Sequence, residues 1–285
     1  MIEAIDVHVH VATGGRAESQ ISTAGEAAAR SYFNVEKMHV SGDEIAAKYR
    51  ALRMKAVIFD VDSETTSGRR ISNDEVADAV GRDPDVLIGF GSVDPWKGAA
   101  AVREIGRCVE ELGLRGMKFE QAAQRFMPNE PQFDAIWDAC SSLGVPVIFH
   151  TGMAGIGAGT PGGSGVRLRY CQPLLIDDVA ASFQNLTIIG AHPSWPWQEE
   201  MLAIARHKAN VYIDLSGWAP KYFPASLVHH ANTLLQDKCL FGSDFPIIPT
   251  ERWLKEFGEL PLKDEVRPKI LRENAARLLG IDLGG

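Results

Sequence analysis

Cysteine is scarce in this sequence, and its spacing matches no metal-binding or redox motif. The 285 residues include four cysteines, and none of them forms a C-x-x-C pair; they are Cys108, Cys140, Cys171 and Cys239. Two of them, Cys108 and Cys140, fall in helical patterns. We therefore interpret all four as reduced thiols of a cytoplasmic protein, which excludes a disulfide framework and a cysteine-rich zinc cluster.

Long runs of one residue kind are also missing. No apolar run reaches the roughly 20 residues that cross a membrane. The net charge is −8 and no segment is rich in lysine and arginine, which argues against nucleic acid as a partner. The N-terminus enters a strand at once, which leaves no room for a signal peptide. We expect a small-molecule substrate and no binding to nucleic acid or membrane, and a homo-oligomer is compatible with the sequence.

What is present is a regular alternation of short apolar strands and amphipathic helices. The predicted strands cover residues 2–10, 56–61, 86–93, 115–120, 145–150, 186–192, 211–215 and 238–244. Several are apolar throughout, which is typical of parallel strands covered on both faces. Eight such units predict an α/β fold, a single (β/α)8 TIM barrel over residues 1–285. Segments 11–42 and 152–172 exceed ordinary loops and are expected to be active-site insertions, the second a glycine-rich mobile lid.

The first predicted strand carries a His-x-His pair. Its apolar residues Ile5, Val7 and Val9 alternate with polar ones, and residues two apart in a strand share a face. His8 and His10 should therefore point the same way, close enough to grip one metal ion. Taken alone, the pair is equally compatible with two surface or hydrogen-bonded histidines.

Three further strands end in a histidine or an aspartate. In a TIM barrel the chemistry lies at the C-terminal ends of the strands, where His150, His192 and Asp244 join the pair. Imidazoles with a carboxylate suit Zn²⁺ or a similar divalent ion. These five residues are one more than a four-ligand site needs, so one histidine would be free to transfer protons.

The motifs around these residues resemble the amidohydrolase superfamily, in the amidohydrolase-related (family 2) branch that includes aminocarboxymuconate semialdehyde decarboxylase. They are Asp6-Val-His-Val-His10, Gly116-Met-Lys-Phe-Glu120, Phe149-His-Thr-Gly152, Gly190-Ala-His-Pro193 and Phe241-Gly-Ser-Asp-Phe-Pro246. The resemblance implies one divalent ion, Zn²⁺ as the first expectation, bound by His8, His10, His150 and Asp244. It also implies that His192 is the catalytic acid or base near a metal-bound water. Asp244 would orient that water or take its proton.

The sequence departs from many relatives at the fourth strand, where Lys118-Phe-Glu120 replaces Lys-x-His-Pro. In binuclear members of the superfamily a carboxylated lysine on this strand bridges two metal ions. Three interpretations stay open: Glu120 is an additional metal ligand, Lys118 holds a substrate carboxylate, or the two side chains pair with each other.

Further residues are candidates for substrate contacts. Arg167 and Arg169 follow the glycine-rich segment and would bind an anionic substrate, or else lie in a solvated loop. Trp195 and Trp218 would wall a planar substrate, or pack beneath loops. Asp214 and Asp6 are candidates to orient the metal-binding histidines.

These patterns favour a metal-dependent hydrolase of a small carbonyl compound, an acidic one from aromatic catabolism. The bond broken would be an ester, a thioester or the C–C bond of a β-keto compound. The first alternative is a nonoxidative decarboxylase of an aromatic or muconate-type acid. A non-catalytic, metal-binding barrel is a further alternative, disfavoured because a structural zinc site is not expected at the catalytic face of a barrel.

Overall fold

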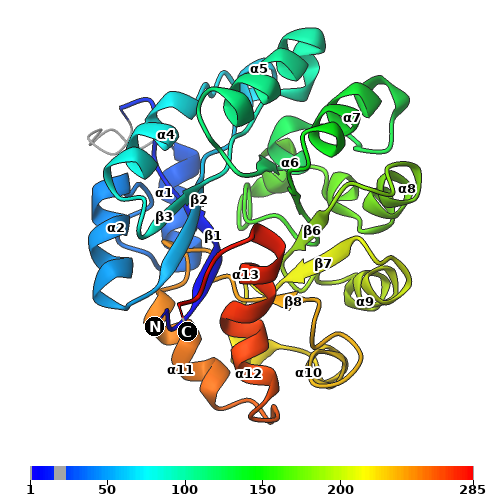
Figure 1. Ribbon diagram of the computed structural model, residues 1–285. Helices are drawn as coiled ribbons and strands as arrows, with labels where there is room; N and C mark the ends of the chain where they lie inside the picture. The colour runs from blue at the N-terminus through cyan, green and yellow to red at the C-terminus, as the bar shows by residue number, and fades with distance from the viewer. Residues whose placement is uncertain (1, 16–23, 285) are drawn as a thin grey trace.

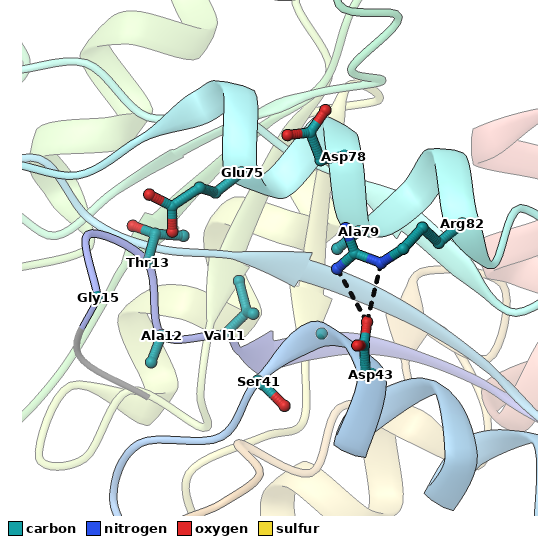
Figure 2. A pocket seen from close by; sticks show the side chains of 11 residues that line it. Val11, Ala12, Thr13, Gly15, Ser41, Asp43, Glu75, Asp78, Ala79 and Arg82 are labelled. Carbon is teal, nitrogen blue, oxygen red and sulfur yellow. Dashed lines mark hydrogen bonds and ion pairs between the residues drawn. The ribbon is translucent and has the colours of Figure 1, made fainter. Parts of the chain in front are cut away.

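Eight parallel strands form the centre of the molecule in the computed structural model, which describes residues 2–15 and 24–284 (Figure 1). The strands are β1 (Ile5–His10), β2 (Lys55–Phe59), β3 (Leu87–Gly89), β4 (Met117–Phe119), β5 (Val147–His150), β6 (Ile188–Ala191), β7 (Val211–Asp214) and β8 (Cys239–Leu240). They pair in two parallel ladders, β1-β2-β3 and β4-β5-β6-β7-β8. All eight predicted strands are present, although most are shorter than expected.

Two seams join these ladders into a closed barrel. At the first, Gly91 pairs with Met117, and the Lys118 amide donates to the Gly91 carbonyl at 2.8 Å. At the second, between β8 and β1, Val9 pairs with Phe245 just beyond β8. There the amides of Val7, His10 and Asp244 donate to the carbonyls of Phe241, Phe245 and His8 at 2.8–3.0 Å. The predicted (β/α)8 TIM barrel is confirmed.

Helices surround the barrel. They are α1 (Ala24–Phe33), α2 (Gly42–Ala51), α3 (Glu64–Ser67), α4 (Asn73–Arg82), α5 (Ala99–Glu110), α6 (Gln121–Gln124), α7 (Asp134–Ser142), α8 (Leu174–Ser182), α9 (Gln198–His207), α10 (Ala225–Ala231), α11 (Thr250–Gly258), α12 (Val266–Pro268) and α13 (Asn274–Leu279). Ser72 caps α4 by accepting the Glu75 amide at 3.1 Å. Within the described residues, no helix is long and apolar enough to cross a membrane.

The apolar core has two shells. The outer shell packs the outward residues of the strands, such as Ile58 and Phe149, against the helices. The inner shell fills the barrel with residues such as Val57, Ile148 and Ile189, and α13 contributes Ala275 to it. Figure 1 shows α13 lying across one end of the barrel, on the side of the N-terminus. The opposite end, where the strands finish, is free to carry polar side chains.

The two predicted insertions differ in structure. In segment 11–42, residues 16–23 lie outside the described residues, and the alanine-rich part beyond them forms helix α1. In segment 152–172, the chain makes two short helical turns, Pro161–Gly165 and Leu168–Cys171. The expectation that both segments serve the active site, and that the second moves, remains a prediction.

Candidate functional site

A bulge in β1 decides which of its side chains face the barrel interior. The pairing of β1 with β2 shifts register between Asp6 and Val9, so the strand does not alternate regularly. Val7 belongs to the inner shell, but Val9 packs in the outer shell. The regular alternation predicted for this strand is therefore wrong: Asp6 does not share a face with His8 and His10, and its carboxylate accepts from Tyr49 Oη of α2 at 2.6 Å.

His8 and His10 nevertheless converge on one carboxylate. Their Nε2 atoms lie 3.4 and 3.0 Å from Asp244 Oδ1, and their ring centroids are 5.2 Å apart. His8 is buried, while the His10 side chain keeps 33% of its surface exposed. These three residues offer ligand atoms that all lie within 4.8 Å of one another. The structure thus brings together three of the four predicted metal ligands on the β8–β1 side of the barrel.

His192 turns into the same space through an unusual backbone conformation. Inner and outer residues alternate along β6, so regular extension would carry His192 away from the interior. Instead its φ is +76°, a region that non-glycine residues rarely occupy. Its ring centroid lies 5.0 Å from that of His8 and 4.6 Å from that of His150. A Cβ at Gly217 would come within 2.3 Å of His192 Nδ1, so glycine is required beneath the ring.

A hydrogen-bonded chain anchors the far side of both rings. Ser216 Oγ lies 2.9 Å from His192 Nδ1 and donates to Asp214 Oδ2 at 2.9 Å. The same carboxylate oxygen lies 2.5 Å from His8 Nδ1. When Asp214 accepts the only hydroxyl hydrogen of Ser216, the hydrogen shared with His192 must come from Nδ1. The Nε2 lone pair of His192 then points into the site, and Asp214 fixes His8 as predicted.

Burial sets the protonation of these groups. It lowers the pKa of His8, and together with the neighbouring His150 it lowers the pKa of His192 to about 3, so both imidazoles are neutral at pH 7. Burial raises the pKa of Asp214 to about 8, against the hydrogen bonds from Ser216. Burial also opposes ionisation of Asp244, but the hydrogen bond and charge of His10 bring its pKa below the usual value. The inward-facing nitrogens are therefore available as ligands or bases.

A second group of polar side chains lies beside β4 and β5. His150 Nδ1 is 2.9 Å from Glu120 Oε2 and 3.1 Å from His192 Nε2. Glu120, His150 and Cys171 offer ligand atoms within 4.8 Å of one another. Burial opposes ionisation of Glu120, but the charge of His150 and its hydrogen bond lower the Glu120 pKa to about 2. His150, predicted as a ligand beside His8, is thus bonded to Glu120 and His192.

Lys118 has no hydrogen bond to Glu120 in this group. Its ammonium is fully buried and lies 5.2 Å from the centre of the Phe59 ring. Within residues 2–15 and 24–284, five buried side-chain nitrogen or oxygen atoms have no hydrogen-bond partner, and three of them are Lys118 Nζ, Glu120 Oε1 and His150 Nε2. Such atoms are costly unless a ligand, ion or water satisfies them.

The predicted substrate contacts lie around this centre. The rings of Trp195 and Trp218 are 5.9 Å apart, beyond the ends of β6 and β7. Trp195 is 44% exposed, so one face of the pair is open to solvent. Arg167 and Arg169 are exposed, and the Arg169 guanidinium stacks over Tyr170. A substrate role for these four residues remains a prediction.

Sequence reasoning missed Ser216 and Cys171 as parts of this site. Ser216 follows Asp214 by two residues, a spacing that could have suggested a shared face. Cys171 carried no such signal, because it comes from a short helical turn about twenty residues after β5.

The donor set fits a divalent metal ion. Ligand atoms held about 2.0–2.1 Å from an ion lie roughly 2.9–3.4 Å from each other in octahedral or tetrahedral geometry. The separations among the inward nitrogens and carboxylate oxygens fall in that range, at 2.9, 3.0, 3.1 and 3.4 Å. The buried ligand atoms without a hydrogen-bond partner, Glu120 Oε1 and His150 Nε2, lie in the neighbouring group beside β4 and β5. His8, His10 and Asp244 are therefore suited to hold the ion, with His150 and Glu120 beside them.

Comparison with other sequences and structures gives consistent likenesses. The family model described as amidohydrolase matches residues 5–281. The 2-amino-3-carboxymuconate-6-semialdehyde decarboxylase of Dictyostelium discoideum is 26% identical over 250 residues, which span 74% of this chain and 66% of that protein. An uncharacterised TIM-barrel protein from Bordetella bronchiseptica superimposes with a TM-score of 0.78 at 24% identity, over 98% of both chains.

A dihydroxybenzoic acid decarboxylase from Polaromonas sp. JS666 superimposes with a TM-score of 0.72 at 18% identity, over 100% of this chain and 98% of that one. That structure contains bound manganese and the inhibitor 2-nitroresorcinol. At these identities the structural likenesses establish the fold.

Proposed function

This chain belongs to the amidohydrolase family, as its motifs indicate, and from that membership we propose that it is a metal-dependent decarboxylase of a small planar acid. The decarboxylases from D. discoideum and Polaromonas favour this activity over the hydrolysis expected from the motifs. The observation that carries the proposal is the anchored imidazole of His192, held beside His8 by the chain through Ser216 and Asp214. This arrangement supports a role in proton transfer for the His192 nitrogen, next to the candidate metal ligands.

His8, His10 and Asp244 would hold the ion. Their two nitrogens and one carboxylate oxygen suit Zn²⁺, while the manganese in the Polaromonas enzyme makes Mn²⁺ the main competitor. When bound, the ion would hold and orient the substrate through one of its oxygen atoms.

The residues of the chain supply the proton and the electrostatic environment. The negative charge of the bound acid favours uptake of a proton from solvent at the free Nε2 of His192, and Nε2 then delivers this proton to the carbon that bears the carboxylate. The bond between that carbon and the carboxylate then breaks, its electron pair stays on the protonated carbon, and CO₂ leaves. The hydrogen bonds that link His192 to Ser216 and Ser216 to Asp214 keep the imidazole oriented during this transfer. The buried Lys118 ammonium has no hydrogen-bond partner among the described residues and attracts an anionic substrate to the barrel mouth.

Isotope labelling tests the reaction directly. Hydroxybenzoates and 2-amino-3-carboxymuconate semialdehyde, labelled with ¹³C in the carboxylate, are incubated in D₂O with metal-loaded protein. We expect ¹³CO₂ and one deuterium on the carbon that lost the carboxylate. The His192→Asn variant serves as the matched control, because it should keep the metal and lose the label release. Absence of ¹³CO₂ across this panel with metal-loaded protein would refute decarboxylation of these acids.

Hydrolysis is the second candidate, and Asp244 supports it. The carboxylate of Asp244 lies beside both β1 histidines, where it is placed to take a proton from an attacking water. Lactones and β-keto thioesters in ¹⁸O-water distinguish this reaction, since the product acid gains one ¹⁸O atom in hydrolysis. Label incorporation with these compounds, without ¹³CO₂ from the acids, would favour hydrolysis.

A further inference from the structure

Cys171 differs from the other three cysteines in what surrounds its sulfur. Cys108 and Cys140 pack in the outer apolar shell, and Cys239 lies on β8 in the same shell. Cys171 is also fully buried, but it faces Glu120 and His150, and the three offer ligand atoms within 4.8 Å of one another. It therefore stands at the polar end of the barrel, where sulfur is chemically available to an ion.

The position of this sulfur is fixed by the backbone on both sides. The Gly152 amide donates to the Cys171 carbonyl at 2.8 Å, which ties the turn Leu168–Cys171 to the end of β5. The backbone of Ala122 in α6 provides a hydrogen bond to the Cys171 side chain. The Lys118 ammonium lies close enough to interact with the sulfur electrostatically. Burial and the charge of Glu120 outweigh these two contacts and raise the pKa of the Cys171 thiol well above its usual value, so a bound ion is needed to stabilise the thiolate.

Its two neighbours have unused ligand capacity. Glu120 and His150 are more than nine-tenths buried, and in the described part of the chain Glu120 Oε1 and His150 Nε2 have no hydrogen-bond partner. Buried acceptors of this kind are satisfied by a bound cation more readily than by apolar packing. A carboxylate, an imidazole and a thiolate form a three-ligand set of the sort that holds zinc with one position left open.

We propose that Cys171 is a thiolate ligand in a metal position formed with Glu120 and His150, and that it biases this enzyme toward Zn²⁺ over Mn²⁺. This inference rests on the proposed metal-dependent function and adds the ion preferred at this position, which lies beside the one formed by His8, His10 and Asp244. Thiolate is a soft ligand that favours Zn²⁺, whereas Mn²⁺ prefers carboxylate and water oxygen. On binding, the Cys171 thiol loses its proton to solvent, a sulfur–metal bond forms, and no oxidation occurs.

Cobalt substitution tests the thiolate directly, without any substrate. The purified full chain is stripped of metal and loaded with Co²⁺, and its absorption spectrum is recorded with its cobalt content. We expect a thiolate-to-cobalt charge-transfer band in the near ultraviolet. The band should persist in Cys140→Ser, the matched buried cysteine, and disappear in Cys171→Ser. In competition, the preference for Zn²⁺ over Mn²⁺ should fall about 10- to 100-fold in Cys171→Ser, the scale seen when a supporting residue of a metal site is lost.

The outcomes separate this inference from the proposed function. Cobalt bound through His8, shown by its loss in His8→Ala, without a charge-transfer band in the unmodified protein would overturn the thiolate proposal. Cys171 would then be a packing residue beside Ala122 and Ala154, and the metal-dependent function would stand. Failure to bind Co²⁺, Zn²⁺ or Mn²⁺ at all would overturn both. The unmodified protein decides whether the charge-transfer band exists, so misfolding of Cys171→Ser does not affect that point, and circular dichroism checks that His8→Ala is folded.

Discussion

Two parts of the barrel mouth contain buried charged residues, but only one of them has buried polar atoms without hydrogen-bond partners. Beyond β2 and β3, the carboxylate of Asp62 meets Lys97 at 2.9 Å, and Asp94 accepts the amides of Trp96 and Thr65 at 3.0 and 2.6 Å. Beside β4 and β5, Lys118 Nζ, Glu120 Oε1 and His150 Nε2 lack partners within the described residues.

The positions of these residues in the sequence do not distinguish the two parts, because all of them end or follow barrel strands. Their hydrogen bonding distinguishes them. A saturated network stabilises the loops that it joins, whereas unpartnered buried atoms point to a bound group. We therefore propose that the reaction takes place at the part of the barrel mouth formed by β4 to β8 and β1. The β2–β3 side then has a structural role.

The largest expected effect is loss of the metal. His8→Ala removes one ligand and the partner of Asp214, so elemental analysis should find most of the divalent ion gone and activity at background. His207→Ala, at the exposed end of α9, is the control and should retain both. A preparation that is metal-free and fully active would contradict the assignment of the site.

The next effect separates proton transfer from metal binding. Asn tolerates a positive φ better than most residues, so His192→Asn should preserve the backbone and the metal. Without the imidazole, kcat should fall roughly 10²- to 10⁴-fold. If the variant loses its metal instead, His192 is a ligand and His150 becomes the better candidate for proton transfer.

A smaller effect is expected at Glu120. Glu120→Gln keeps the shape of the side chain but removes its charge and one ionic contact to His150. We expect metal affinity to weaken about 10- to 100-fold, measured by competition with a chelating dye. Unchanged affinity would return Glu120 to a structural role as the partner of His150.

Ser216 should affect the rate alone. Ser216→Ala removes one hydrogen bond to His192 Nδ1, a loss of about 1 kcal/mol, which corresponds to roughly a fivefold decrease in kcat. KM and metal content should stay constant, the pH profile of kcat should shift, and Ser216→Thr should restore the rate. A decrease in stability with no change in the pH profile would show that Ser216 only supports the fold.

The smallest functional effect belongs to the scaffold side. Asp94→Ala deletes the acceptor of the Trp96 and Thr65 amides, so the free energy of unfolding should drop by about 0.5–2 kcal/mol in urea titrations. The metal content and kcat should remain within about twofold of the unmodified protein. A large loss of metal would mean that the β2–β3 side belongs to the active site after all.

Much of this arrangement follows from patterns in the sequence. Apolar runs that end in His150, His192 and Asp244 predict a parallel barrel with its polar residues at one end, and the His-x-His spacing predicts that His8 and His10 adjoin. These inferences depend only on strand periodicity and on the direction of parallel strands.

The remaining features depend on local deviations from that periodicity. The bulge in β1 puts Asp6 outside the barrel, and no residue type in the strand signals it. The positive φ of His192 occurs without glycine, so it has no compositional mark. The contacts of Cys171 arise from tertiary packing of a loop, which strand periodicity cannot describe.

The seam between β8 and β1 gives the metal a mechanical role. His8 and His10 lie on one side of that seam and Asp244 on the other, and His10 and Asp244 are 234 positions apart in the sequence. An ion shared by these side chains would act as a reversible cross-link between the first and last strands of the barrel. Transient separation of the seam would then require release of the ion, so native-state hydrogen exchange at the amides of Val7, His10 and Asp244 would slow as occupancy rises. The exchange rate of amides in the first strand would therefore measure how much of the protein has an ion bound.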